Sequence, residues 1–355
     1  MSAPSRPRDL AIWAFALGYF LCYAPYSALT KTIAQGHLPG MTRALSGFAL
    51  LPITTFTSMV GMFVFLTLMG WWKYAGRRPL PGAARLFGKA VTLPLPGRWT
   101  FLSGLCSAAI IGTTTLSYAI SGVSIVFMML MMRGGVLVIA PLVDALGKRH
   151  VRWFSWVALA LSLGALLVTF SIRTSYALTA IAAVDVLIYL AAYFIRLRFM
   201  SHLAKSDDPT ARTRYFVEEQ MVATPAIVMA LGLLALVGGD GAITSAIRAG
   251  FTDVASSGAV LGGIAVGLLS QGTGIFGGLI LLDRRENTFC VPVNRASSVL
   301  AGIVATLAMT ALLGAPAMPR AELAGAVLIL TAIAVLAIAP AMEGRRPLLR
   351  PAGAH

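Results

Sequence analysis

The chain contains 355 residues, of which 58% are hydrophobic and 12% charged, and its formal net charge is +15. Soluble domains carry roughly 25% charged residues, so the composition excludes an ordinary soluble domain and predicts a membrane protein. The positive charge does not indicate nucleic-acid binding, because the basic residues cluster in short loops between apolar segments. The three cysteines are dispersed in apolar segments, which favours packing roles over a disulfide framework.

Ten apolar segments follow one another, each near the ~20 residues that a helix needs to cross the hydrocarbon core. The first begins after a short polar stretch without a small-residue cleavage site, so we expect it to remain in the protein. Glycine and proline occur within these segments, and membrane helices tolerate both. We expect spans near residues 9–34, 46–72, 99–119, 122–146, 152–172, 176–198, 215–237, 255–282, 288–313 and 320–340.

The basic residues fall almost entirely on one side of this predicted bundle. Of the 28 lysines and arginines, 21 lie on the side of the two termini and 5 on the other. The positive-inside rule therefore predicts cytoplasmic N- and C-termini and a cytoplasmic loop at 73–98, which we expect to contact anionic lipids. The composition, rich in alanine, glycine and arginine, suggests a GC-rich bacterial source, so we expect an integral protein of a bacterial inner membrane.

The two remaining arginines, Arg133 and Arg295, lie inside apolar stretches at matching places in the two halves of the chain. Five spans are an odd number, so a second five-span unit must insert upside down relative to the first. A pseudo-two-fold axis in the membrane plane then relates the two arginines. This predicts an all-α membrane protein with two inverted five-helix repeats, residues 1–172, including the 73–98 loop, and residues 173–355.

This pattern resembles the drug/metabolite transporter superfamily, the EamA-like permeases. The similarity is clearest at 121–171, where the basic turn 147–150 joins the fourth and fifth spans, and again at 288–340. Two features depart from the usual pattern, because the 73–98 loop is long and the acidic residue after the fourth span is represented only by Asp144, slightly upstream. The resemblance implies a secondary transporter for small organic solutes and leaves the solute open.

Arg133 and Arg295 are the main candidate site residues. An arginine near mid-membrane costs at least ~2.5–3.5 kcal/mol on insertion scales and usually faces a partner, a cavity or a substrate. One interpretation is an anion-binding pair, because the guanidinium fork suits carboxylate or phosphate. The alternative is an internal salt bridge or a cap on helix carbonyls. Asn294 and Ser298 would share one polar helix face with Arg295.

Further polar residues lie within the predicted spans. Asp185 is expected either to couple transport to protonation or to act as counter-ion of an arginine. Gln271 lies in a glycine-rich span, where glycines favour close helix packing and could also permit unwinding beside a cavity. Tyr23 and Tyr26 sit deep in the first span and are expected to face the pathway. Glu218 and Glu219 open the seventh span, where acidic residues suit a first helical turn.

The residues together favour a secondary transporter that moves a small anionic or zwitterionic metabolite across the inner membrane by alternating access. Two alternatives stay open: a flippase for a lipid-linked anion and, less favoured, a membrane-embedded enzyme acting on lipids. The four histidines show no ligand spacing, and HExxH, GxSxG and Walker motifs do not occur, so we expect no enzymatic activity, metal or cofactor. The expected partners are a small-molecule substrate and membrane lipids, without nucleic acid, and a homodimer remains open.

Overall fold

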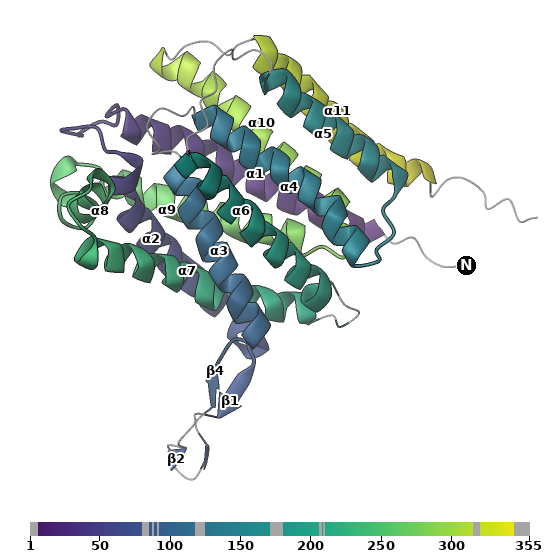
Figure 1. The fold of residues 1–355 in the computed structure, drawn as a ribbon, viewed down its shortest axis with the longest axis horizontal. Coiled ribbons are helices and arrows are strands. Elements are labelled where there is room, and N and C mark those ends of the chain that lie inside the picture. Colours follow the sequence, from purple (N-terminus) through teal and green to yellow (C-terminus); the bar gives the residue numbers. More distant parts are fainter. Residues whose placement is uncertain are drawn as a thin grey trace, which may run out of the picture.

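A computed structural model describes residues 6–79, 85–86, 89–90, 92–117, 125–170, 180–205, 208, 210–314 and 320–343 of the chain. Most of these residues form helices (Figure 1). The α-helices are α1 (Arg6–Ala34), α2 (Gly47–Leu68), α3 (Arg98–Ser117), α4 (Ile125–Leu146), α5 (Trp153–Phe170), α6 (Ala180–Phe199), α7 (Ala211–Val237), α8 (Ala242–Thr252), α9 (Val260–Leu281), α10 (Asn287–Leu313) and α11 (Arg320–Glu343).

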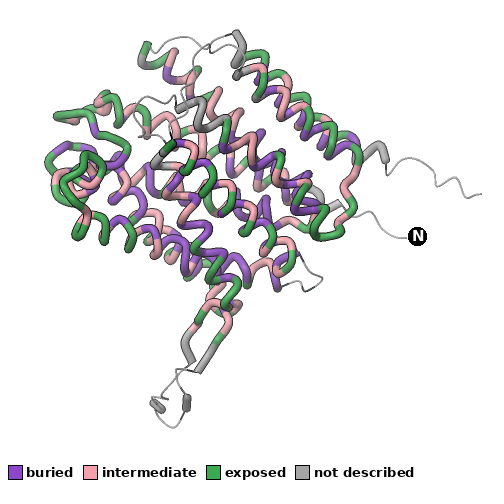
Figure 2. The backbone as a smooth tube through the Cα atoms, viewed as in Figure 1, coloured by how far each residue is buried: buried purple, intermediate pink, exposed green. Residues whose placement is uncertain are grey.

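The chain is an α-helical membrane protein. By length and composition, five of the described helices can cross a membrane, namely α1, α2, α7, α9 and α10. Large apolar side chains cover the outside of the bundle, and Leu68, Leu236 and Leu261 are each more than 80% exposed. Figure 2 shows buried residues along the inward faces of the helices and exposed residues along the outward faces. This surface suits a hydrocarbon solvent, in which exposed apolar side chains carry no penalty.

Helices from the two predicted halves pack closely against each other. Helix α1 contacts α9 and α10, helix α2 contacts α7, α8 and α9, and α4 contacts α6 and α10. Glycines permit the close approach of α9, since a Cβ at Gly277 would lie 2.8 Å from the Tyr19 ring and one at Gly267 only 2.7 Å from the Thr54 carbonyl oxygen. Helices α5 and α11 form a further pair at the upper right of Figure 1.

Two local elements differ from the expectation. The loop at 73–98 contains short strands, with β1 (Arg77–Pro79) paired antiparallel to β4 (Thr92–Pro94) and β2 (Arg85–Leu86) to β3 (Lys89–Ala90). This segment lacks a continuous apolar face, so its backbone groups pair in a ribbon that projects below the bundle in Figure 1. The short helix α8 was not expected, and it precedes a span that begins at Val260 rather than at 255.

Glu218 of α7 forms hydrogen bonds with residues at the base of this ribbon. Its Oε1 accepts a hydrogen bond from the Gly76 amide at 3.0 Å, and its Oε2 accepts bonds from the Gly97 amide at 2.9 Å and the Thr100 hydroxyl at 2.5 Å. Helix α7 begins at Ala211, so Glu218 and Glu219 lie beyond its first turn. The expectation of a charge favourable to a helix N-terminus is therefore wrong for both residues.

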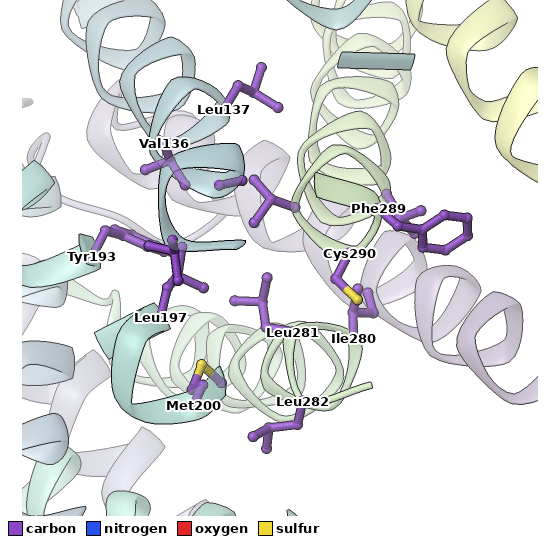
Figure 3. Close-up of a cluster of buried hydrophobic side chains, with 14 of the residues drawn as sticks. Val136, Leu137, Tyr193, Leu197, Met200, Ile280, Leu281, Leu282, Phe289 and Cys290 are labelled. Atoms are coloured by element: carbon purple, nitrogen blue, oxygen red, sulfur yellow. The ribbon is translucent and has the colours of Figure 1, made fainter. Parts of the chain in front are cut away.

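We call the end of the bundle that carries Arg149, Lys205 and Arg284 the basic end. A large apolar cluster extends through the bundle toward this end and includes Val136 and Leu137 of α4, Leu197 of α6 and Ile280 of α9 (Figure 3). These side chains are 0–1% exposed, so they are packed in the interior between the helices.

Asp144 binds the start of α10 at the basic end. Its Oδ1 accepts hydrogen bonds from the Asn287 amide at 3.0 Å and side chain at 2.7 Å, and its Oδ2 accepts bonds from the Thr288 amide at 2.7 Å and hydroxyl at 2.8 Å. The carboxylate of α4 thus satisfies amides that the first turn of α10 would leave without partners. Asp144, near the end of the fourth predicted span, therefore joins α4 to α10.

Glu286, at the N-cap of α10, joins α10 to α5. Its Oε1 accepts hydrogen bonds from Arg152 Nε at 3.1 Å and from the Ser155 hydroxyl at 2.8 Å. Burial raises the pKa of Glu286, but the hydrogen bonds from Arg152 and Ser155 and the charge of Arg152 outweigh it, so the pKa lies below its ordinary value of 4.5. The ionised form is therefore the one that the fold stabilises.

We expect Glu286→Gln to destabilise the protein by about 1–3 kcal/mol at neutral pH, the usual range for hydrogen bonds to a charged group. A lowered pKa means that this stability is present above pH 4.5 and is lost as the pH falls through the pKa of the folded state. Thermal unfolding in detergent at several pH values should show a gap between wild type and variant that closes below pH 4.5. A gap that persists in strong acid contradicts this assignment.

Candidate functional site

A cavity of about 330 Å³ lies within the bundle. Its walls come from α1, α2 and α3 of the first predicted half and from α6, α7, α9 and α10 of the second. The lining extends to Thr30 and Gly47, at the end of the bundle opposite the basic end. The cavity therefore lies between the two predicted halves, where the sequence predicts a polar site. Of the predicted site residues, the cavity brings together Tyr23, Tyr26, Gln271, Asn294 and Arg295.

Arg295 brings an uncompensated charge to this cavity. Its side chain is only 8% exposed, and its Nε and Nη2 atoms are buried without a hydrogen-bond partner among the described residues. Its Cζ lies 4.9 Å from the centre of the Tyr193 ring, close enough for a cation–π contact. No aspartate or glutamate is among the described residues of the lining. Two guanidinium nitrogens of a residue in the cavity wall thus lack a hydrogen-bond partner among the described residues.

Arg133 reaches the cavity through a tyrosine. Its Nη2 donates a hydrogen bond of 2.6 Å to the hydroxyl of Tyr23, and its Cζ lies 5.8 Å from the centre of the Tyr23 ring. Tyr23 lines the cavity, whereas Arg133 is not among its lining residues. The two predicted arginines therefore differ in position, since Arg295 lies in the wall and Arg133 supports a side chain of the wall.

The remaining polar wall comes from α1, α2 and α9. Tyr23 stacks on Tyr19 with ring centres 5.5 Å apart and meets the edge of Tyr26 at 5.7 Å, which forms an aromatic surface along α1. Gln271 accepts a hydrogen bond of 2.8 Å from the Ser58 hydroxyl through Oε1. Aromatic faces beside a few fixed polar groups are typical of sites for small organic molecules.

Two predicted residues do not take the roles expected of them. Ser298 is 1% exposed and donates its hydroxyl hydrogen to the Arg295 carbonyl oxygen at 2.7 Å, so it bonds back to its own helix and does not line the cavity. Asp185 is 2% exposed, and neither of its oxygens has a hydrogen-bond partner among the described residues. It therefore does not serve as counter-ion to Arg133 or Arg295 in this structure.

The cavity wall also contains a buried ion pair that was not predicted from the sequence. Arg196 lines the cavity and binds Glu219 through Nε at 2.7 Å and Nη2 at 3.0 Å. Glu219 is fully buried, and its Oε1 also accepts bonds of 2.9 Å from the hydroxyls of Ser103 and Ser107. In the sequence Arg196 counts among the 21 basic residues on the side of the termini, near the end of the predicted span 176–198. Its place three residues after Tyr193, on one face of α6, was the available signal.

The two arginines of the wall therefore contribute differently to the electrostatics. Glu219 neutralises Arg196 with a two-pronged ion pair, whereas Arg295 contacts tyrosine and keeps its full charge. A buried charge without an opposite charge is costly, and an anion in the cavity would offset that cost. The site is thus chemically suited to carboxylate, phosphate or another compact anionic group.

No protein-family model matches the chain, and no curated protein matches it. A solved structure described as "Crystal structure of protein" has 14% sequence identity and superposes with a TM-score of 0.55. The match covers 95% of this chain and 99% of that one. At this identity the likeness shows the fold alone, and it extends over nearly the whole bundle.

Proposed function

We propose that this chain is a ten-span secondary transporter of the drug/metabolite type, integral to a bacterial inner membrane with cytoplasmic termini. It carries a small organic anion or zwitterion by alternating access. The observation that supports this most directly is Arg295, whose buried guanidinium has unpartnered nitrogens in the wall of a cavity between the two halves. Intramembrane ionisable residues of this kind mark substrate pathways.

The helix lengths support ten spans. All the described α-helices except α8 contain between 18 and 29 residues, close to the ~20 needed to cross the hydrocarbon core. With only 11 residues, α8 is too short to cross and is assigned to the membrane surface. The spans are then α1 to α5 in the first repeat and α6, α7, α9, α10 and α11 in the second.

The arginine contacts follow the proposed repeat. Arg133 on the fourth span of the first repeat contacts Tyr23 on its first span. Arg295 on the fourth span of the second repeat contacts Tyr193 on its first span. The two fourth spans, α4 and α10, pack against each other. Equivalent contacts in both halves are the expected result of an inverted duplication with the site at its interface.

The closed basic end supports an outward-open conformation. The apolar cluster, the Asp144 cap and the Arg152–Glu286 pair join helices at that end, whereas the cavity lining reaches Thr30 and Gly47 at the other. If the basic end faces the cytoplasm, substrate enters from outside and binds Arg295. Alternating access then requires the contacts at the basic end to open.

The size of the cavity favours a metabolite over a lipid-linked anion. Sites for small molecules measure ~300–1,000 Å³, and this cavity of about 330 Å³ lies at the lower limit. The anionic group would bind Arg295, and its organic part would lie against Tyr19, Tyr23 and Tyr26. Gln271 and Asn294 supply further hydrogen-bonding groups.

Ligand-induced thermal stabilisation of the purified protein tests this proposal. The panel contains acetate, lactate, succinate, benzoate, glutamate, inorganic phosphate and, as the matched cation, choline. A ligand that binds only the folded form adds ~2.7 kcal/mol at a concentration of ~100 times Kd. We expect at least one organic anion to raise the unfolding temperature. Stabilisation by choline alone contradicts the proposal.

A further inference from the structure

A row of buried polar side chains runs along one face of α6. Asp185, Tyr189, Tyr193 and Arg196 follow at intervals of four, four and three residues, which places them above one another on the helix. All four are buried, with exposed fractions of 2%, 4%, 7% and 8%. Tyr189 and Tyr193 contact each other, and Arg196 forms an ion pair with Glu219. Asp185 has no hydrogen-bond partner among the described residues.

Asp185 lies in surroundings that disfavour a charge. Both carboxyl oxygens are buried without a hydrogen-bond partner among the described residues. Helix α6 packs against α3 and α4, whose described titratable or charged groups are Arg98, Cys106, Arg133 and Asp144, and it continues into the turn that carries His202. None of these groups hydrogen-bonds to Asp185. A carboxyl group buried without a partner holds its proton, because ionisation there is costly.

The same face of α6 connects Asp185 to the anion site. Tyr189, one turn from Asp185, lies 4.9 Å from Tyr193 between ring centres. Tyr193 lines the cavity, and its ring centre lies 4.9 Å from Cζ of Arg295. Two buried aromatic rings therefore lie between the buried acid and the buried guanidinium. Charges interact strongly across a protein interior.

We propose that Asp185 is a proton-binding site coupled to the anion site at Arg295, so that the protein carries a proton together with its anion. This inference rests on the proposed transport function. An anion on Arg295 repels an ionised Asp185, whereas it does not repel a protonated one. Each ligand therefore favours the other, and this coupling is reciprocal. The proton binds a carboxylate oxygen from one side of the membrane and leaves to the other, and no covalent bond other than O–H changes.

Proton-driven accumulation in proteoliposomes tests the inference. The probe is the anion of the panel above that stabilises the wild type most. With an inward proton gradient of about one pH unit, one-to-one coupling predicts accumulation of about tenfold. We expect Asp185→Asn to lose this accumulation and Asp185→Glu, which keeps a titratable carboxyl, to retain it. Anion binding should weaken as the pH rises in the wild type and stay constant in Asp185→Asn.

A matched control is Ser162→Ala, because Ser162 is also buried and its hydroxyl has no partner among the described residues. This variant should accumulate the anion as the wild type does. Equal proton-driven accumulation by Asp185→Asn and wild type overturns the inference. Exchange of the anion by wild type with no response to the proton gradient overturns the coupling alone. A wild type that neither binds nor exchanges any anion of the panel overturns the transport function as well.

Discussion

Replacement of Arg295 by glutamine is expected to weaken anion binding by about 100-fold or more and to leave the folded protein at least as stable as the wild type. Each hydrogen bond from the guanidinium to an anion contributes about 1.5–3 kcal/mol, so losing two weakens binding by about 100-fold or more. The uncharged side chain also removes a buried charge that lacks an opposite charge among the described residues. Thermal unfolding with and without the anion measures both effects together.

Arg295→Lys is the matched control, since it keeps the charge but not the planar fork, and its affinity should lie between those of wild type and Arg295→Gln. A structural role for Arg295 makes the opposite prediction. In that case Arg295→Gln lowers the unfolding temperature by several degrees without ligand, and any remaining folded protein still binds the anion. That pair of results contradicts an anion site.

The second large effect is expected at the ion pair in the cavity wall. Glu219→Ala leaves Arg196 buried without its carboxylate and removes the acceptor of the Ser103 and Ser107 hydroxyls. Breaking a buried pair in this way destabilises a protein by about 3–5 kcal/mol. Thermal unfolding of the variant in detergent should show a correspondingly large decrease in stability.

The control for this prediction removes both charges. Arg196→Met combined with Glu219→Met should recover most of the lost stability, because the replacement of a whole buried pair by apolar residues is often neutral or stabilising. If the single variant loses less than about 1 kcal/mol, the pair behaves as an exposed one. The assigned burial of Glu219 would then be wrong.

The helical class of this protein follows from its sequence because the apolar segments are long and the loops basic. Two elements were not predicted from the sequence, and each has a physical reason. Helix α8 has 11 residues and an interrupted apolar pattern, so its hydropathy does not indicate a membrane span. The ribbon of β1 and β4 depends on backbone pairing across the loop and on its anchor at Glu218, and neither depends on hydropathy.

The sequence predicted the site residue whose charged side chain is costly to bury in a membrane. Arg295 stands out because a guanidinium cannot discharge, and its neighbours on the helix face follow from geometry. A sequence does not show whether a serine hydroxyl faces a cavity or bonds to its own helix. The Ser298 hydroxyl bonds to its own helix, which the sequence did not reveal. Partners on different helices are also not visible in a sequence, since Arg196 and Glu219 look like ordinary helix-end charges until the fold brings them within 2.7 Å of each other.

Exchange by the purified protein in proteoliposomes tests the central claim most directly. Vesicles loaded with the best-binding anion of the panel are diluted into trace radiolabelled anion, and entry of the label is followed for wild type and Arg295→Gln. We predict that wild-type vesicles loaded with the anion take up more label than unloaded ones and that Arg295→Gln vesicles match protein-free ones. Uptake by the variant at the wild-type rate, or none by a wild type that binds the anion, contradicts a transporter built around Arg295.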